Sequence, residues 1–287
     1  MQRYAIAGHS IQISGEGLDS PPRFGLFLSK NVYDLPLLVI CVEEEVMQDE
    51  GISFFALEDK GANYNFFYKN DVWFSKMKMP DGECFWTKIY REGDAFQAVI
   101  QRSGIFDYIS LRSIWIAFSI AALSRQTVSI HASTVMYRGK SVLFLGESGT
   151  GKSTHAQLWL NHIPYTELLN DDCPFLRVEA DGNIQVYGSP WSGKTPCYKN
   201  MHTPVAAFVR LSQAPYNRIR RLTGIEAIAA LLPSCPLTFA YDKQLSESIY
   251  SVLSHALQQA PVYHLECLPN ADAARLVYET LKEDKRL

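Results

Sequence analysis

The sequence has few of the features that mark secreted, membrane or nucleic-acid-binding proteins. Its six cysteines are scattered without a CxxC pair, so neither a zinc site nor a disulfide framework is indicated, and free thiols are expected. The longest uncharged apolar run, Ser113–Ser124, has 12 residues and is too short to cross a bilayer. A formal net charge of −3 provides no basic excess for nucleic acid. We therefore expect a cytoplasmic protein without nucleic-acid or membrane partners.

The first third of the chain is dominated by strand signals. Its first residues, MQRYAIAGHSIQIS, alternate polar and apolar side chains, which favours a strand over a signal peptide. Aromatic side chains at strand spacing usually pack in a core, and a binding platform is the alternative. We predict a β-rich region over 1–105 and a second domain over 106–287. The clearest predicted strands, alternating or aromatic, are 37–43, 64–69, 71–77 and 84–90.

The second domain mixes strands and helices without a regular alternation. An apolar helix is predicted over 107–125, followed by a hairpin that turns at Arg138-Gly139. Several neighbouring strands have no helix between them, so the expected fold class is a mixed α/β (α+β) sheet. Further strands are expected at 166–172, 183–188, 206–211 and 261–268, and helices at 224–232, 242–259 and 270–283.

Residues 146–154, GESGTGKST, satisfy the phosphate-loop (Walker A) pattern GxxxxGK[ST]. A strand, SVLFL, precedes the loop and a helix, THAQLWLNHI, follows it, so the positive end of the helix adds to the site. Lys152 is expected to reach the β and γ phosphates of ATP, and the Ser153 hydroxyl to bind Mg²⁺. The predicted nucleotide-binding residues are Gly146, Glu147, Ser148, Gly149, Thr150, Gly151, Lys152, Ser153 and Thr154.

A second segment, GSPWSGKT at 188–195, fits the same pattern in an unsuitable context. Pro190 removes a backbone donor inside the segment, and Pro196 discourages a following helix. A Gly/Pro turn with an exposed lysine is therefore the preferred interpretation of this segment.

Two adjacent acids provide the groups that a phosphate loop needs. Asp171 and Asp172 end the predicted strand TELL and follow Lys152 by 19 and 20 residues. One carboxylate can bind Mg²⁺ while the other accepts a proton from the attacking group. A turn with a capping aspartate is the alternative. Of the histidines, His131 is expected within a strand as a hydrogen-bonded core residue, and His155 as an exposed or capping side chain.

Basic residues gather near the predicted strand 206–211. Arg218, Arg220 and Arg221 form a cluster that is expected to be a solvated turn, and contact of the basic residues with phosphate or an acidic substrate is the alternative. Arg210, which precedes the cluster, is the candidate substrate contact from this region.

The segment HASTVMYRGKSVLFLGESGTGKST, followed by LLNDD, resembles the C-terminal domain of HPr kinase/phosphorylase and its relatives, which share their core with phosphoenolpyruvate carboxykinase. The resemblance runs from His131 to the C-terminus. It implies nucleotide phosphates at 146–154 and Mg²⁺ on Ser153 and one acid, for which Asp172 is chosen. It also implies proton transfer by the aspartates, with Asp171 the first choice for the base. His131 then occupies the position of the active-site histidine.

The chain departs from the bacterial kinases of that family at several positions. Glu147 stands where they usually carry aspartate, and Thr154-His155 replaces an acidic residue. The phosphorylase segment is not recognisable and the N-terminal half does not match, so HPr is not indicated as the substrate. The chain looks closer to uncharacterised or peptide-associated relatives, in which GxPWxGK recurs, and this places Lys194 on the substrate side.

The leading functional hypothesis is an ATP-dependent kinase that transfers the γ phosphate to a hydroxyl, such as serine, of a peptide, protein or small molecule. A non-catalytic nucleotide-binding sensor or accessory protein is the alternative. A carboxykinase acting on oxaloacetate is disfavoured because no ligand set for a second metal and a small diacid is visible. The acceptor, the nucleotide base and the oligomeric state, a homo-oligomer included, are left open.

Overall fold

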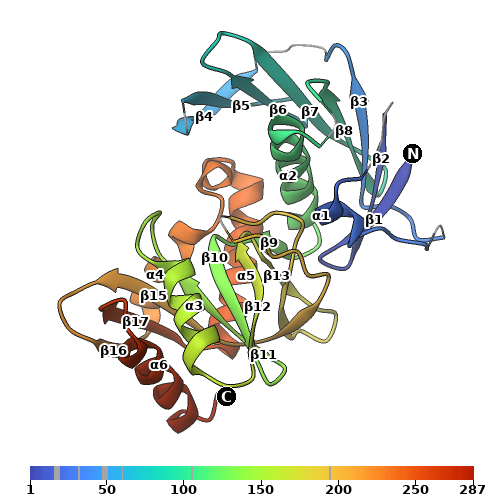
Figure 1. Ribbon diagram of the computed structural model, residues 1–287. Coiled ribbons are helices and arrows are strands. Elements are labelled where there is room, and N and C mark those ends of the chain that lie inside the picture. Colours follow the sequence, from blue (N-terminus) through green and yellow to red (C-terminus); the bar gives the residue numbers. More distant parts are fainter. Residues whose placement is uncertain (16–19, 32, 47–50, 60, 105, 194) are drawn as a thin grey trace. The chain divides into compact units, whose positions relative to one another are not determined.

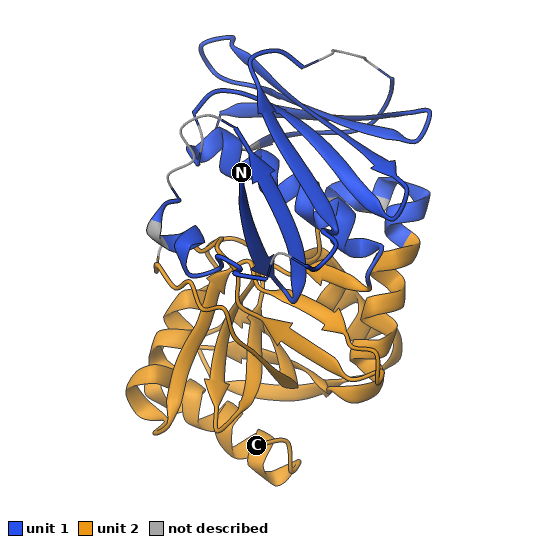
Figure 2. Cartoon of the chain, turned by 90° about the vertical axis from the view of Figure 1, so that its right-hand side faces the viewer, with its two compact units in different colours: residues 1–125, 238–246 blue, residues 126–237, 247–287 orange. Residues whose placement is uncertain are grey.

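The computed structural model describes residues 1–15, 20–31, 33–46, 51–59, 61–104, 106–193 and 195–287. The chain forms two compact units. Figure 1 colours the chain by sequence position, and Figure 2 colours it by unit. The first contains residues 1–125 and 238–246, and the second contains residues 126–237 and 247–287. The division follows Arg125, whereas the sequence placed it after residue 105, because the apolar helix packs on the sheet of the first unit.

The first unit is built on an eight-stranded sheet with the order β1-β2-β3-β8-β7-β6-β5-β4. Its pairs are antiparallel except β2–β3 and β3–β8. The N-terminal segment predicted as one strand is a hairpin, with positive φ of 49° at Ala7 and 73° at Gly8. The strands are β1 Gln2–Ile6, β2 His9–Ser14, β3 Leu38–Glu43, β4 Ile52–Asp59, β5 Ala62–Lys69, β6 Val72–Lys78, β7 Cys84–Glu92 and β8 Ala95–Gln101.

One helix covers a face of this sheet. α2 (Tyr108–Leu123) contacts β3, β7 and β8, and its first turn is capped by Asp107, whose Oδ1 accepts from Ser110 N at 2.7 Å. Phe67, Phe74 and Trp86 form a separate buried cluster. The aromatic runs are thus strands whose largest rings are buried, as the core-packing interpretation predicted. Short helical segments complete the unit at α1 Pro22–Gly25 and η2 Leu237–Tyr241.

The second unit contains a nine-stranded sheet of mixed direction. The path runs β12-β10-β11-β15-β14-β13-β9, and β17 pairs with both β15 and β16. The fold is therefore α/β with a mixed sheet. The strands are β9 Thr127–Ser129, β10 Ala132–Tyr137, β11 Lys140–Leu145, β12 Thr166–Asp172, β13 Phe175–Val178, β14 Ile184–Tyr187, β15 His202–Gln213, β16 Arg218–Leu222 and β17 Val262–Cys267.

The β10–β11 hairpin brings three strand ends to one edge of the sheet. Its turn has φ of 46° at Arg138 and 81° at Gly139, which confirms the predicted turn. Ser133 of β10 pairs with Phe144 of β11 on one side and with Asp171 of β12 on the other. The residues after β11 and the last residues of β12 consequently flank the start of β10.

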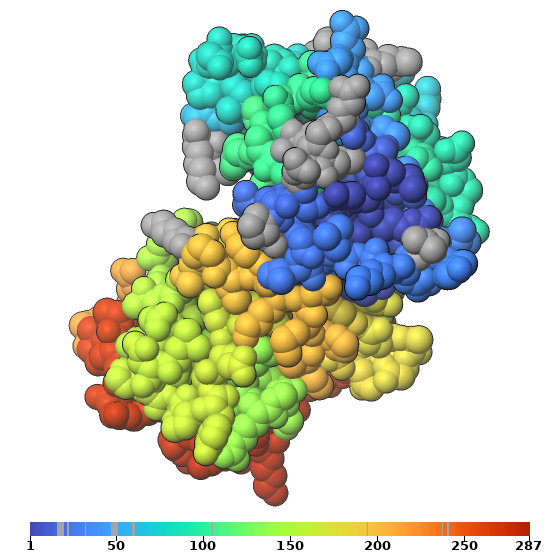
Figure 3. All heavy atoms as spheres, turned by 45° about the vertical axis from the view of Figure 1, so that its right-hand side comes forward, coloured from blue at the N-terminus to red at the C-terminus, as the bar shows by residue number. Residues whose placement is uncertain are grey.

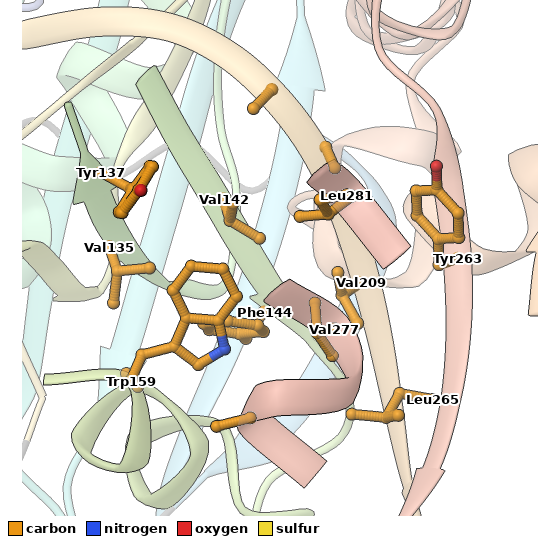
Figure 4. Close-up of a cluster of buried hydrophobic side chains, with 14 of the residues drawn as sticks. Val135, Tyr137, Val142, Phe144, Trp159, Val209, Tyr263, Leu265, Val277 and Leu281 are labelled. Carbon is orange, nitrogen blue, oxygen red and sulfur yellow. The ribbon is translucent and has the colours of Figure 1, made fainter. Parts of the chain in front are cut away.

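Helices α3 (Lys152–His162) and α6 (Ala271–Glu283) pack against each other and bury side chains on the strands. Trp159 of α3 and Val277 and Leu281 of α6 lie over side chains of β10, β11, β15 and β17 (Figure 4). Trp159 and Val277 are fully buried, so this cluster anchors the helix that follows the loop at 146–151.

The remaining helices lie close to their predicted bounds, at α4 Gly224–Leu231 and α5 Lys243–Gln259, with a short 3₁₀ turn, η1, at Leu232–Ser234. The arginine cluster is part of a strand, β16, and the predicted turn is wrong. Pairing of β16 with β17 places Arg218 opposite Glu266, which favours a strand over a solvated turn. Among the described helices, none is both long and apolar enough to cross a membrane.

Candidate functional site

The residues between β11 and α3 form a compact loop that depends on glycine. Gly146, Gly149 and Gly151 have φ of 151°, 84° and 103°, which disfavour residues with a side chain. A Cβ at Gly146 would lie 2.5 Å from Thr150 Oγ1. Thr150 Oγ1 donates to the Glu147 carbonyl at 2.8 Å, which closes the loop on itself. The loop predicted from GxxxxGK[ST] therefore has the backbone conformation that its glycines imply.

The loop leads directly into the N-terminus of α3, with Gly151 as the N-cap residue. The first N–H groups of a helix have no intrahelical acceptor, and they carry the positive end of its dipole. Lys152 Nζ donates to the carbonyl oxygens of Gly146 and Glu147, at 2.9 and 3.2 Å. Burial lowers the pKa of Lys152, and the nearby Asp172 and Glu147 carboxylates oppose that shift. The loop, the N-terminus of α3 and the Lys152 ammonium group together favour the binding of an anion.

Asp171 is buried against the loop and the start of β10. Its Oδ1 accepts from Ser153 Oγ at 2.8 Å and from the Ser133 hydroxyl, so two serines fix the carboxylate. Its Oδ2 is buried and has no hydrogen-bond partner among the described residues. A buried oxygen without a partner is costly unless another group binds it, which makes Oδ2 a candidate ligand atom.

Asp172 lies beside Asp171 and pairs with a histidine. His131 Nδ1 is 3.0 Å from Asp172 Oδ1, and both side chains are about half exposed. Asp172 has φ of 143°, which is strained for a residue with a side chain, and a β-bridge to Ser192 holds its backbone. The two neighbouring acids thus lie in different environments, one buried and one open to solvent.

His131 does not lie within a strand, contrary to the prediction. It lies between β9 and β10, where the chain leaves its pairing with β13 and begins its pairing with β12. The His131 backbone N–H donates to the Ser234 carbonyl at 2.6 Å. This hydrogen bond, and not strand pairing, holds the backbone of the residue. Its side chain is then free of the buried core and meets Asp172.

The described residues 188–193 of the second GxxxxGK[ST] segment pack on the strand that carries the two acids. The described residues 195–201 that come after it contain no helix, which agrees with its rejection as a phosphate loop. Asn170 Nδ2 donates to the Trp191 carbonyl at 3.0 Å, and Gly193 N donates to the Asp171 carbonyl. A Cβ at Gly193 would lie 2.9 Å from the Asp171 carbonyl oxygen, so this close approach requires glycine. Figure 3 shows the surface of the second unit around this segment. Lys194 lies outside the described residues.

Two polar residues of the site were missed in the sequence. Ser133 and Asn170 are both buried, at 1% and 0% exposed; Ser133 donates to Asp171, and Asn170 donates to the Trp191 carbonyl of the neighbouring segment. A signal was present for Ser133, a polar residue in a strand whose residues are all buried, whereas Asn170 stands among the polar residues of TELLNDD and does not stand out. Without the pairing of β10 with β12, however, neither residue could be assigned to the site.

Arg210 lies beside the loop and is bonded to it. Its Nη2 is 2.6 Å from Glu147 Oε1, and its Nη1 donates to the Ala230 carbonyl at 3.1 Å. The ion pair with Glu147 therefore brings Arg210, the predicted substrate contact, to the loop at 146–151. Arg218 and Arg220 instead form ion pairs with Glu266 and Glu226.

His155 is buried, and its prediction as an exposed or capping side chain is wrong. It is 2% exposed, and its ring packs against Phe144, with the centroids 4.6 Å apart. Burial lowers the pKa of His155 from 6.5 to about 4. The ring faces β11 because position 155 lies on the side of α3 that also carries the buried Trp159. His155 is consequently neutral near pH 7.

Replacing His155 by leucine should reduce the loss of folding stability that occurs in mild acid. Because the folded pKa of about 4 lies below 6.5, the unfolded chain binds more protons between these values, and stability falls as the pH decreases through this window. Between pH 7 and pH 5 this effect lowers the free energy of unfolding of the unsubstituted protein by about 2 kcal/mol. Urea unfolding at both pH values measures it, with the exposed His162→Leu as matched control. Equal pH dependence in His155→Leu and the unsubstituted protein would contradict this assignment.

Comparison with known proteins finds structural similarity at a low level. No family model matches the chain, and no curated protein matches it in sequence. The solved structure of the HPr(Ser) kinase/phosphatase from Coxiella burnetii matches with 14% identity and a TM-score of 0.33. The match covers 55% of this chain and 90% of that one. A TM-score at this level does not establish a shared fold, so the function must be inferred from the geometry of the site.

Proposed function

We propose that the protein is an ATP-dependent kinase that transfers the γ phosphate to a hydroxyl group. The observation that carries this proposal is the hydrogen bond of 2.8 Å between Ser153 of the phosphate loop and the buried Asp171. It joins the expected phosphate site to an acid, and a second acid, Asp172, follows with a histidine partner. Together they supply the positioning and electrostatic groups that phosphoryl transfer needs.

The residues present fit a magnesium ion. Mg²⁺ in nucleotide sites usually takes one or two protein oxygens and completes its shell with phosphates and water. Ser153 Oγ and the unpartnered Asp171 Oδ2 are the two oxygens that would hold it. No group of three or more His, Cys, Asp or Glu suited to a metal occurs among the described residues, and this site does not require one. Bound Mg²⁺ would neutralise charge on the phosphates.

The environments of the two acids favour exchanging the roles that the sequence suggested for them. Asp171 is 2% exposed and holds two serine hydroxyls on one oxygen, so it suits the metal side of the site. Asp172 is about half exposed and is oriented by His131, so it can meet an incoming hydroxyl. We therefore propose Asp172 as the base and Asp171 as the metal ligand.

The proposed reaction is an in-line displacement at the γ phosphorus. The acceptor hydroxyl gives its proton to Asp172, and its oxygen forms a bond to phosphorus while the bond to the β-phosphate oxygen breaks. ADP leaves with the electron pair of that bond. Lys152 and the N–H groups of the loop stabilise the charge that moves to the phosphate oxygens. His131 holds Asp172 in position through the contact of 3.0 Å between its Nδ1 and Asp172 Oδ1.

The acceptor proposed is a hydroxyl, such as serine, of a peptide, protein or small molecule. Lys194 and Arg210 are proposed on the substrate side, with Arg210 acting through its ion pair with Glu147. γ-Labelled ATP incubated with serine peptides and small hydroxyl compounds tests the assignment. A labelled phosphoester should form with the unsubstituted protein and fall by about 1000-fold in Asp172→Asn. Transfer that survives in the double variant Asp171→Asn with Asp172→Asn would sink the proposal, and nucleotide binding without any transfer would favour a sensor.

A further inference from the structure

A pocket of about 640 Å³ adjoins the phosphate loop within the second unit. Its wall starts at the loop glycines Gly149 and Gly151, continues along α3 to Leu158, and is closed by residues that follow β15 and β17. The volume lies within the range of small-molecule sites, which is about 300 to 1,000 Å³. Pro215 and Leu268 contribute apolar surface at the ends of the two strands.

The pocket lies on the other side of the loop from the acids. β15 and β17 are neighbours on one side of β11, whereas β10 and β12, which carry Ser133, Asp171 and Asp172, are neighbours on the other. None of the acids lines the pocket. A ligand whose phosphates sit at the start of α3 can therefore extend into the pocket without occupying the space beside Asp172.

The lining of the pocket carries no charged side chain at neutral pH. It consists of glycine, alanine, leucine and proline with a few threonine, glutamine, histidine and cysteine side chains. Burial lowers the pKa of His155 to about 4 and raises the pKa of the Cys267 thiol, so both side chains are neutral. Gln213 Nε2 already donates to the Gly149 carbonyl at 3.1 Å. The adjoining loop and Lys152, in contrast, favour an anion.

We propose that this pocket binds the nucleoside end of the nucleotide whose phosphates lie on the loop. The inference rests on the proposed function and adds to it the location of the base and ribose. A ligand with a polyanionic end and a flat, uncharged end matches the adjoining charged and uncharged surfaces. Contact with Leu158, Leu211 and Leu268 would remove apolar surface of the base from water, which favours binding.

The test compares MgADP with magnesium tripolyphosphate, which has the phosphates and lacks the nucleoside. Titration calorimetry on the full chain should give at least tenfold tighter binding of MgADP. Ala214→Phe, which fills part of the pocket, should weaken MgADP binding at least tenfold and leave tripolyphosphate within twofold. Leu268→Ala, which removes apolar surface without adding bulk, should weaken MgADP severalfold. Leu35→Ala in the first unit, where Leu35 is 89% exposed, is the matched control and should change neither ligand.

The outcomes separate the pocket from the loop. Equal affinity for the two ligands, or unchanged MgADP binding in both pocket variants, would overturn the nucleoside assignment while the loop could still bind phosphate. Equal weakening of both ligands in Ala214→Phe would also overturn it, because the pocket would then only support the loop. Binding of both ligands that is insensitive to Lys152→Ala would overturn the proposed function itself.

Discussion

Asp171→Asn should lower the rate of phosphoryl transfer by about 1000-fold, which corresponds to about 4 kcal/mol of transition-state stabilisation. The substitution keeps the size of the side chain. It also keeps one oxygen that can accept the hydrogen bonds from the Ser153 and Ser133 hydroxyls, as Asp171 Oδ1 does. It removes the negative charge and the free carboxylate oxygen that Mg²⁺ requires. Titration of ADP with and without Mg²⁺ should show that the metal no longer strengthens binding, and labelled ATP measures the rate.

Asp172→Asn is the matched control for that result. It makes the same chemical change one residue away, at a side chain that is about half exposed and paired with His131. Transfer should fall here as well, because a proton acceptor contributes about 10² to 10⁴ in rate, but the effect of Mg²⁺ on ADP binding should persist. The opposite pattern, with Mg²⁺ dependence lost only in Asp172→Asn, would show that the metal ligand is Asp172, as the sequence first suggested.

Lys152→Ala should weaken ADP binding by about 100-fold, or about 3 kcal/mol. The ammonium is held over the loop by the Gly146 and Glu147 carbonyls, so its removal takes away the cation nearest the expected phosphates. At an ADP concentration of about 100 times the original dissociation constant, the nucleotide should stabilise the unsubstituted protein by about 2.7 kcal/mol and the variant by about 0.4 kcal/mol. Chemical unfolding with and without ADP gives both values.

Lys78→Ala serves as the control for this experiment. Lys78 is an exposed lysine at the end of β6 in the first unit, so the same charge is removed far along the chain from the loop. It should leave stabilisation by ADP unchanged. Equal stabilisation of Lys152→Ala and Lys78→Ala by ADP would mean that the nucleotide binds elsewhere.

Local sequence patterns predicted the elements of the fold well. The GxxxxGK[ST] pattern, the Arg138-Gly139 turn and the apolar helix after Asp107 depend on nearby residues, and each was confirmed as loop, turn and helix. The strand nature of the aromatic runs was also readable, because alternation along a strand reflects burial on one face of a sheet.

The predictions that proved wrong concern features that depend on contacts between distant segments. His131 leaves its strand because the chain changes partners there, and no periodicity within SIHAS shows that change. The arginines at 218–221 form a strand only because β17, some 45 residues later, pairs with them. His155 is buried by Phe144, which lies on the strand that enters the loop. The roles proposed for Asp171 and Asp172 likewise follow from their different burial. Two identical neighbouring residues show no such difference in the sequence.

A crystal structure with ADP and Mg²⁺ would show whether the loop at 146–154 holds the phosphates and Asp171 holds the metal. We expect phosphates at the N-terminus of α3 and a magnesium ion about 2.1 Å from Ser153 Oγ, with Asp171 Oδ2 as its carboxylate ligand directly or through one water. Asp172 and His131 should face the open side of the phosphate chain. Phosphates bound away from residues 146–154, or a metal held by Asp172 with Asp171 still bonded only to the two serines, would show that the proposed site is wrong.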